Sequence, residues 1–195
     1  MKKYLVIGNP IEHSLSPLIH NHWINKYRLF GSIYENRKLE EKDLKNLIKE
    51  IRNDEISGAN VTVPFKKLII PFLDELDSIA KSTGSVNTIF KVRNKIVGFN
   101  TDQLGFSLTI RELFLPKKES VELKTLAEKN IFILGAGGVT SSIICAIESQ
   151  GGRIYLSNRT KKRAEEIKEK YKSIEILEWG ERPPLCDIVV NTTSI

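Results

Sequence analysis

The heptapeptide NVTVPFK, Asn60 to Lys66, places a strand, a proline and a lysine in close succession. It begins with β-branched residues that alternate with short polar ones, a pattern typical of a strand with one buried face. Pro64 ends that strand, because proline has no amide hydrogen for the ladder and is accepted in the first turn of a helix. We therefore expect a helix over 65–70, with Lys66 at the carboxyl end of the strand.

The polar side chains of this heptapeptide form a candidate binding site. In open α/β sheets, ligands bind at the carboxyl ends of the strands. The amide of Asn60, the hydroxyl of Thr62 and the amine of Lys66 are thus expected to converge on one small polar molecule. The alternative is a buried strand followed by a solvated lysine, since most lysines are surface charges.

Composition limits the class of protein. The chain has 195 residues, 41% of them hydrophobic and 28% charged, which is the balance of a globular chain rather than a disordered one. Its formal charge of +6 comes mostly from lysines in the expected helices 40–52 and 161–172, where acidic residues accompany them. We interpret this as solvated helix faces with a mild attraction for anionic substrates. No basic run is interleaved with aromatic residues, so we expect no nucleic-acid partner.

The cysteines and the apolar runs indicate the cellular compartment of the protein. Cys145 and Cys186 are isolated and have no metal-ligand spacing, so we expect no metal site and a reducing, cytoplasmic environment. The first apolar run, Tyr4 to Ile7, is too short for a signal sequence, and no later run approaches the ~20 residues of a membrane span. We therefore expect no membrane partner.

The loop after the first strand carries Ser14 and Ser16. Ser16 precedes Pro17 and a helical pattern over 18–27, so it is interpreted as the helix cap, and this pattern gives Ser14 no structural role. Arg93 and Asn94 are expected to form the turn of a hairpin. The other elements expected in this half are strands over 4–8, 33–36, 89–90 and 96–99 and helical segments over 40–52, 67–72 and 74–82.

A further polar group follows the hairpin in GFNTD, Gly98 to Asp102. A helix to about Phe114 comes next, and Asp102 is equally well explained as its N-cap. From 115 to 130 the sequence is charged and has no strand pattern, which indicates a connecting segment. We expect a first domain over 1–113, a connection over 114–128 and a second domain over 129–195.

The second half begins with a glycine-rich turn between a strand and a helix. Ile131 to Leu134 is an apolar strand, and 139–149 has the pattern of an amphipathic helix. The turn between them consists of Gly135, Ala136, Gly137 and Gly138. Such a turn lets backbone amides approach a pyrophosphate at the helix N-terminus. The alternative is a purely structural turn.

The loop after the next strand, 153–157, points to the kind of nucleotide. An NAD site usually has an acidic residue roughly 20 positions past the glycines, where it binds the ribose hydroxyls. This chain instead has SNRT, Ser157 to Thr160, and Arg159 is suited to a 2′-phosphate. The pattern therefore favours NADP. The alternative is that Arg159 and the nearby Lys161, Lys162 and Arg163 are only the ordinary basic start of a helix.

Taken together, these motifs resemble the shikimate dehydrogenase family in order and approximate spacing. The resemblance extends over essentially the whole chain. It rests on SLSP (Ser14–Pro17), NVTVPFK (Asn60–Lys66), VNT (Val86–Thr88), GFNTD (Gly98–Asp102), GAGG (Gly135–Gly138), SNRT (Ser157–Thr160) and NTTS (Asn191–Ser194). It implies an α/β fold of two domains, an N-terminal open α/β substrate domain and a C-terminal Rossmann-type NADP-binding domain. It also implies reversible, NADP-dependent reduction of 3-dehydroshikimate to shikimate, a step in aromatic amino-acid biosynthesis.

The resemblance also assigns roles to residues. It implies that Lys66 is the catalytic group, beside Asp102, and that Ser14 and Ser16 bind the substrate carboxylate. The residues implied for the substrate hydroxyls are Asn60, Thr62, Asn87 and Asp102. The residues expected to bind the cofactor are Gly135, Ala136, Gly137, Gly138, Asn158, Arg159, Thr160, Arg163 and Thr192. The expected partner is a small-molecule substrate, and a homodimer is left open.

The chain departs from the family in two places. Ser85 stands where the family commonly has alanine, which leaves Asn87 in place. The family also continues for several dozen residues past the strand near Thr192, and we expect this chain to be a fragment or a shortened relative with an incomplete second domain. Two other functions stay open: a quinate/shikimate dehydrogenase that uses NAD, and a non-catalytic protein that binds a polyhydroxylated carboxylate.

Overall fold

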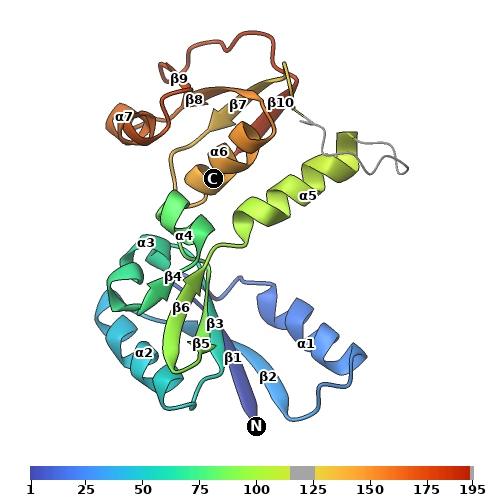
Figure 1. The fold of residues 1–195 in the computed structure, drawn as a ribbon, viewed down its shortest axis with the longest axis vertical. Coiled ribbons are helices and arrows are strands. Elements are labelled where there is room, and N and C mark those ends of the chain that lie inside the picture. Colours follow the sequence, from blue (N-terminus) through green and yellow to red (C-terminus); the bar gives the residue numbers. More distant parts are fainter. Residues whose placement is uncertain (115–125, 194–195) are drawn as a thin grey trace. The chain divides into compact units, whose positions relative to one another are not determined.

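Two separate sheets organise the chain in the computed structural model, which describes residues 1–114 and 126–193. One sheet belongs to a unit formed by Met1–Thr101 and the other to a unit formed by Asp102–Ile195. Helices accompany the strands of both sheets (Figure 1). The predicted α/β architecture with two sheets is therefore confirmed.

The sheet of the first unit has six strands in the order β2-β1-β3-β5-β6-β4. β1 runs parallel to β2 and β3, and β4 runs parallel to β6, whereas β5 is antiparallel to both of its neighbours. The sheet is thus mixed, with three parallel and two antiparallel strand pairs. The elements of this unit are β1 (Lys2–Gly8), α1 (Ser16–Lys26), β2 (Ser32–Lys38), η1 (Glu41–Asp43), α2 (Leu44–Arg52), β3 (Gly58–Val61), α3 (Phe65–Leu68), η2 (Ile70–Phe72), β4 (Glu75–Leu76), α4 (Ser78–Thr83), β5 (Thr88–Val92) and β6 (Lys95–Phe99).

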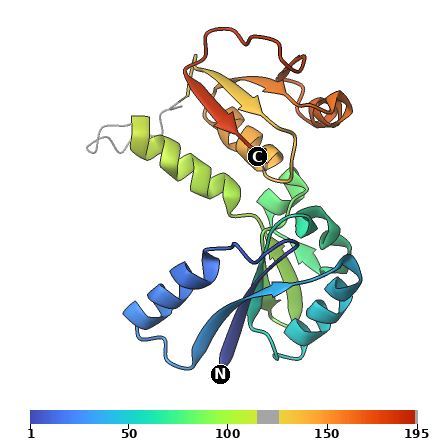
Figure 2. The ribbon, with the colours of Figure 1, turned by 180° about the vertical axis from the view of Figure 1, so that it is seen from behind.

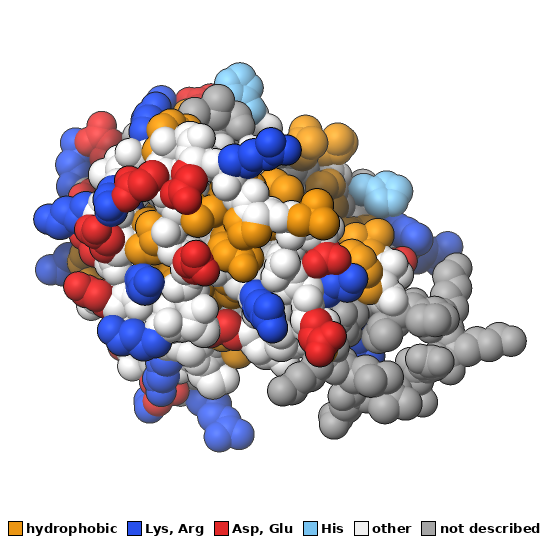
Figure 3. Space-filling view, turned by 90° about the horizontal axis from the view of Figure 1, so that it is seen from above, with side chains coloured by type: hydrophobic (Ala, Val, Ile, Leu, Met, Phe, Trp, Pro, Cys, Tyr) orange, Lys and Arg blue, Asp and Glu red, His pale blue; other side chains and the backbone are white. Residues whose placement is uncertain are grey.

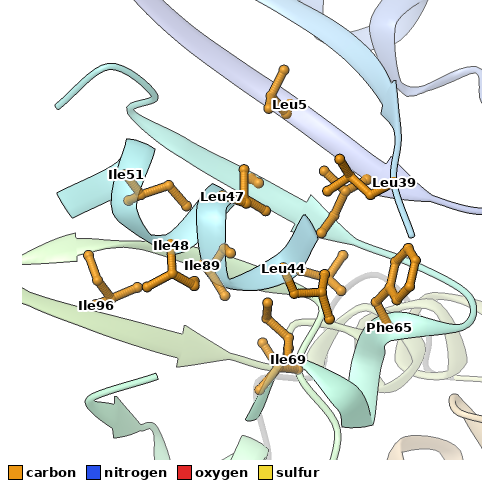
Figure 4. Close-up of a cluster of buried hydrophobic side chains, with 14 of the residues drawn as sticks. Leu5, Leu39, Leu44, Leu47, Ile48, Ile51, Phe65, Ile69, Ile89 and Ile96 are labelled. Atoms are coloured by element: carbon orange, nitrogen blue, oxygen red, sulfur yellow. The ribbon is translucent and has the colours of Figure 1, made fainter. Parts of the chain in front are cut away.

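Successive side chains of β1 point to opposite faces of the sheet, and both faces are covered by apolar side chains. Leu5 and Ile7 belong to the main core, whereas Val6 belongs to a smaller cluster with Tyr34 and Ile24 of α1. α1 and α2 accordingly lie on opposite faces of this sheet (Figure 2). The main core holds the apolar side of α2, whose Leu44, Leu47, Ile48 and Ile51 point toward the strands and α3 (Figure 4).

The hairpin of β5 and β6 is as expected. Its two central residues, Arg93 and Asn94, have φ angles of 47° and 69°. Two consecutive positive φ angles characterise the hairpin turns whose twist matches that of the strands. This turn returns the chain so that the residues before β5 and after β6 lie at the same edge of the sheet, next to the end of β3.

One expectation in this unit is wrong. The segment 74–82 was expected to be helical, but Glu75 and Leu76 form β4, which pairs with Val97 and Gly98 of β6. Backbone pairing with a distant strand outweighs the local helical pattern here. The helix α4 begins only after Asp77, whose side chain caps it by accepting a hydrogen bond of 2.7 Å from the backbone N–H of Ala80.

Removal of this cap should destabilise the first unit moderately. We expect Asp77→Ala to lower the free energy of unfolding by about 0.5–2 kcal/mol, because an N–H group at the start of α4 loses its acceptor. Asp77→Asn should retain most of the stability, since asparagine caps helices about as well. Urea unfolding followed by circular dichroism measures both variants. Equal losses for the two variants would contradict a capping role.

The second unit contains a four-stranded, fully parallel sheet in the order β10-β7-β8-β9. Its elements are α5 (Asp102–Phe114), β7 (Asn130–Leu134), α6 (Thr140–Ser149), β8 (Arg153–Ser157), α7 (Lys161–Lys170), β9 (Glu175–Leu177) and β10 (Ile188–Asn191). Its core joins Ile110 of α5 to Ile143 and Ile147 of α6. α5 thus packs within the second unit, although we assigned it to the first domain. The limits 1–113 and 129–195 stay a prediction, and most of the expected connection 114–128 lies outside the described residues.

The surface carries charges of both signs. On the face in Figure 3, Lys and Arg side chains are interspersed with Asp and Glu, as expected for solvated helix faces. Cys145 and Cys186 are not joined in a disulfide. Within the described parts of the chain, no helix is long and apolar enough to cross a membrane.

Candidate functional site

Polar side chains gather in the first unit where β3 ends, β5 begins and β6 ends. Asn60 of β3 lies opposite Thr88 of β5 in the antiparallel ladder, and its Nδ2 donates a hydrogen bond of 3.0 Å to the Thr88 Oγ1. The Thr88 hydroxyl donates in turn to Asn87 Oδ1 at 3.0 Å. We call Tyr34, Asn60, Asn87, Thr88 and Thr101 the amide cluster.

Asn87 is the most buried asparagine side chain of this cluster, with 9% of its surface exposed. Its Oδ1 accepts a hydrogen bond of 3.0 Å from the backbone N–H of Thr101, and its Nδ2 donates one of 2.9 Å to the Thr101 Oγ1. Thr101, the second residue after β6, therefore fixes the orientation of the Asn87 amide. The structure brings two expected substrate residues, Asn60 and Asn87, into one hydrogen-bonded group.

A backbone hydrogen bond places Lys66 next to the amide cluster. Its carbonyl oxygen accepts a hydrogen bond of 2.8 Å from the N–H of Val86, the residue before Asn87. Phe65, only 2% exposed, anchors the first turn of α3 in the main core. The backbone of the next residue, Lys66, therefore has a well-defined place in the fold. Thr62 joins the end of β3 to β1, because its N–H donates to the carbonyl of Ile7 at 2.9 Å. The predicted strand–proline–helix turn is confirmed.

The structure corrects one expectation for the serines of the SLSP loop, and their binding of a carboxylate stays a prediction. The N-cap of α1 is Leu15, with no side-chain capping bond, so the interpretation of Ser16 as the cap is wrong. Ser14 Oγ instead accepts a hydrogen bond of 3.3 Å from the backbone N–H of Ser16. The Ser16 side chain is close enough to the Tyr34 hydroxyl to lower the pKa of Tyr34. Its hydroxyl is therefore directed toward the amide cluster rather than along its own helix.

Asp102 is the first residue of α5, which belongs to the second unit. A carboxylate in the first turn favours a helix because it opposes the positive end of the macrodipole. Asp102 follows Thr101 directly, and Thr101 contacts Asn87. The pairing of Asp102 with Lys66 stays a prediction.

A shallow hollow of about 250 Å³ lies on the face of the first sheet beside the amide cluster. Its walls include Tyr4, Tyr34, Asn60, Thr88 and Phe90. Of the expected substrate residues, only Asn60 lines it. The hollow therefore adjoins the candidate site without containing Lys66, and the site is better defined by its hydrogen bonds than by this depression.

In the glycine-rich turn of the second unit, the fold requires glycine at Gly135, whereas it leaves room for a side chain at Gly137. Gly135 has a φ of +107°, and a Cβ there would lie 2.7 Å from the Thr192 Oγ1. At Gly137 an added Cβ would meet only the Thr192 carbonyl oxygen at 3.5 Å, an ordinary contact. Gly137 is exposed, so its bare backbone is accessible to a ligand. This favours a nucleotide-binding turn over a purely structural one.

Two hydroxyl groups hold the shape of this turn. Thr140 Oγ1 accepts from the N–H of Gly137 at 2.9 Å and lies 3.1 Å from the carbonyl oxygen of Gly135. Thr192 Oγ1 lies 2.9 Å from the carbonyl oxygens of both Leu134 and Gly135, and 3.0 Å from Thr140 Oγ1. Thr192 thus positions the turn from within. Thr140 was not predicted from sequence, because its contact with Thr192 depends on the return of the chain after β10.

The loop after β8 presents exposed cations at the same end of the sheet. Asn158 ties it to the turn, since Asn158 Oδ1 accepts from the N–H of Ala136 at 3.0 Å and its Nδ2 donates to the Thr160 carbonyl at 2.8 Å. Lys161 forms an ion pair with Glu178, which raises the pKa of Lys161. Arg159 and Arg163 are exposed, and neither forms an ion pair with any residue in the described part of the chain.

These residues fit a nucleotide that carries a 2′-phosphate. A bare glycine backbone precedes α6, and exposed guanidinium groups follow β8 where an acidic residue would favour NAD. In the described ranges, no group of three or more His, Cys, Asp or Glu side chains could hold a metal ion. The fold and these residues define an α/β protein with two sheets and a nucleotide-binding second unit.

Comparison with known proteins gives the family. Residues 6–89 match the shikimate dehydrogenase substrate-binding domain, and residues 117–194 match shikimate / quinate 5-dehydrogenase. The whole chain is 50% identical to shikimate dehydrogenase (NADP(+)) of Pelagibacter ubique and spans 69% of its length. The chain belongs to the shikimate dehydrogenase family.

Solved structures agree with this assignment. The crystal structure of shikimate dehydrogenase from Aquifex aeolicus is similar over all of this chain and 69% of its own, with 35% identity and a TM-score of 0.84. The Thermus thermophilus shikimate 5-dehydrogenase, crystallised with NADP(H) and shikimate, is similar over 99% of this chain and 69% of its own, with 28% identity and a TM-score of 0.80. The fold class expected from sequence is therefore confirmed.

Proposed function

We propose that this protein catalyses the reversible, NADP-dependent reduction of 3-dehydroshikimate to shikimate. The observation that carries the proposal is the hydrogen-bonded amide cluster beside Lys66, in a chain that is 50% identical to an NADP-dependent shikimate dehydrogenase. A polyhydroxylated ring needs several fixed hydrogen-bonding groups, and Asn60 and Asn87 supply them from neighbouring strands.

Lys66 is the proton donor and acceptor in this proposal. In the direction of reduction, its ammonium group gives a proton to the ketone oxygen, which becomes the new hydroxyl; in oxidation, the amine removes that proton. Asp102 orients Lys66 and binds a neighbouring hydroxyl. Ser14 and Ser16 bind the carboxylate, and Thr62 binds a hydroxyl with Asn60.

The second unit holds the cofactor. NADP, when bound, supplies the hydride, and the protein contributes binding and orientation. The backbone of Gly135, Ala136, Gly137 and Gly138 receives the pyrophosphate. Arg159 and Arg163 bind the 2′-phosphate, supported by Asn158 and Thr160, while Thr192 holds the turn.

An assay with binding controls tests the proposal. Purified protein is mixed with shikimate and NADP, and the appearance of NADPH is followed, with quinate and NAD as comparison reactants. In a preparation that turns over, we expect NADPH formation with shikimate and NADP above all other pairs. Calorimetric binding of shikimate without turnover would support the binding-protein alternative, and a folded protein that neither binds nor oxidises shikimate would overturn the proposal. A homodimer and a cytoplasmic location are further proposals, which sedimentation and cell fractionation would test.

A further inference from the structure

Tyr34 is held on three sides in the first unit. Its residue surface is only 5% exposed, and its ring packs with Val6 and Ile11. The His20 ring stacks on it, with centroids 4.1 Å apart and planes inclined by 6°. The side-chain amide of Asn21 brackets its backbone, donating to the Tyr34 carbonyl at 2.7 Å and accepting from its N–H at 3.0 Å. Its ring therefore has one well-defined position.

This arrangement directs the Tyr34 hydroxyl at the amide cluster. The hydroxyl donates a hydrogen bond of 2.6 Å to Asn60 Oδ1. Burial raises the pKa of Tyr34 to about 12, and a hydrogen bond with the Ser16 side chain opposes this shift. At neutral pH the phenol therefore keeps its proton and remains a donor. The Tyr34 hydroxyl thus contacts Asn60 and is close to Ser16, two residues that the proposed function places around the substrate.

The hydrogen bonds of Asn60 determine what this side chain can offer to a ligand. Its Nδ2 donates to the Asn87 carbonyl at 3.3 Å and to the Thr88 Oγ1 at 3.0 Å, so both amide protons are used. Its Oδ1 has two lone pairs, and Tyr34 is the only donor to it among the described residues. Asn60 can therefore give a ligand only one acceptor position.

The direction of these bonds follows from backbone groups that cannot reverse. The Thr101 N–H must donate, so the Asn87 oxygen faces it. The Asn87 carbonyl must accept, so the Asn60 nitrogen faces that carbonyl. The Asn60 oxygen consequently faces the Tyr34 hydroxyl and not the strand.

We propose that Tyr34 is a positioning residue: the Asn87 carbonyl sets the direction of the Asn60 amide, and the Tyr34 hydroxyl holds the Asn60 oxygen in place so that it accepts a hydrogen bond from one ring hydroxyl of the substrate. This inference rests on the proposed function and deepens it. Asn60 selects a hydroxyl over a ketone or a hydrogen at that ring position, because only the hydroxyl can donate. Without the Tyr34 hydroxyl, the Asn60 side chain loses the bond that holds its oxygen, and the selection weakens.

The test compares Tyr34→Phe with Tyr4→Phe. Tyr4 lines the same hollow, and its hydroxyl makes no hydrogen bond within the described residues, so it controls for the loss of a phenol on this face. We expect Tyr34→Phe to raise the Kd and KM for shikimate about tenfold, the effect of one hydrogen bond, with kcat nearly unchanged. Tyr4→Phe should leave the Kd, KM and kcat as in the wild type. An unchanged Kd in Tyr34→Phe would overturn the inference.

A double-mutant cycle separates positioning from general stability. If Tyr34 acts through Asn60, then Tyr34→Phe should have little effect on shikimate affinity in an Asn60→Ala background. Losses that add in full would overturn the positioning role. Deoxy analogues of shikimate provide a second comparison. The analogue lacking the hydroxyl that Asn60 accepts should bind wild type and Tyr34→Phe with similar affinity.

A measurement on the wild-type protein covers the case in which Tyr34→Phe does not fold. The side-chain amide protons of Asn60 should exchange slowly in NMR spectra both before and after shikimate is added, because both are bonded within the protein. New engagement of these protons by shikimate would overturn the inference. If wild-type protein neither binds nor oxidises shikimate, the proposed function fails; if it binds and Tyr34→Phe binds equally well, only the role of Tyr34 fails.

Discussion

Replacing Lys66 by alanine is expected to lower kcat by about 10²–10⁴-fold, the range for a lost general acid or base. The reason is that proton transfer at the ketone oxygen then depends on water, while the amide cluster stays intact. Binding should suffer less, since Thr88 and Thr101 still hold Asn60 and Asn87 by hydrogen bonds. Steady-state kinetics with shikimate and NADP in a preparation that turns over measures this.

The next residue provides a matched control for Lys66. Lys67 has the same side chain, lies in the same helix α3, and is exposed. Lys67→Ala should keep kcat within about twofold, because surface substitutions away from a site have small effects. Near-wild-type kcat for Lys66→Ala, or equal losses in both variants, would remove Lys66 from the catalytic role.

The second large effect concerns cofactor choice. Arg159→Ala should raise the KM for NADP by about 10- to 150-fold, which corresponds to one charge-assisted contact of ~1.5–3 kcal/mol. The KM for NAD should change little, because NAD has no 2′-phosphate. Higher salt should reduce the difference between wild type and variant, since Arg159 is exposed and its charge is screened.

Arg153 is the control for this experiment. It lies at the start of β8, whereas Arg159 follows the end of the same strand, and both are exposed. Arg153→Ala removes the same charge from the opposite end of the strand and should leave the KM for both nucleotides unchanged. If Arg159→Ala raises the KM for NADP and for NAD equally, Arg159 supports the loop and does not bind the 2′-phosphate.

The sequence predicted those elements whose pattern of apolar and polar residues lies within the element itself. The strand at 153–157 agrees with β8, and the helix from Asp102 to about Phe114 agrees with α5. The glycine turn was recognised because its strand, glycines and helix are consecutive. By contrast, β4 was interpreted as helix, because pairing of Glu75 and Leu76 with β6 depends on residues about twenty positions away.

The same difference explains what was missed in the site. Asn60, Lys66 and Asn87 were found through motifs, whereas Tyr34, Thr88 and Thr140 were not singled out for any role. Tyr34 reads in sequence as an ordinary aromatic of a strand, and its role depends on Asn60, far along the chain. Thr140 reads as a residue of an amphipathic helix, and only the position of Thr192 shows that it braces the turn. Roles that arise from the meeting of distant segments leave no pattern in the sequence near the residue.

The hairpin turn at Arg93 and Asn94 has a practical consequence. The turn is exposed and lies at the end of β5 away from Thr88, a distance of roughly 13 Å for a strand of this length. Exposed loop tips of this kind accept inserted segments better than other places in a fold. A peptide tag or a fluorophore attachment site placed between Arg93 and Asn94 would therefore leave the amide cluster undisturbed, which offers a way to immobilise or label the protein without blocking its substrate residues.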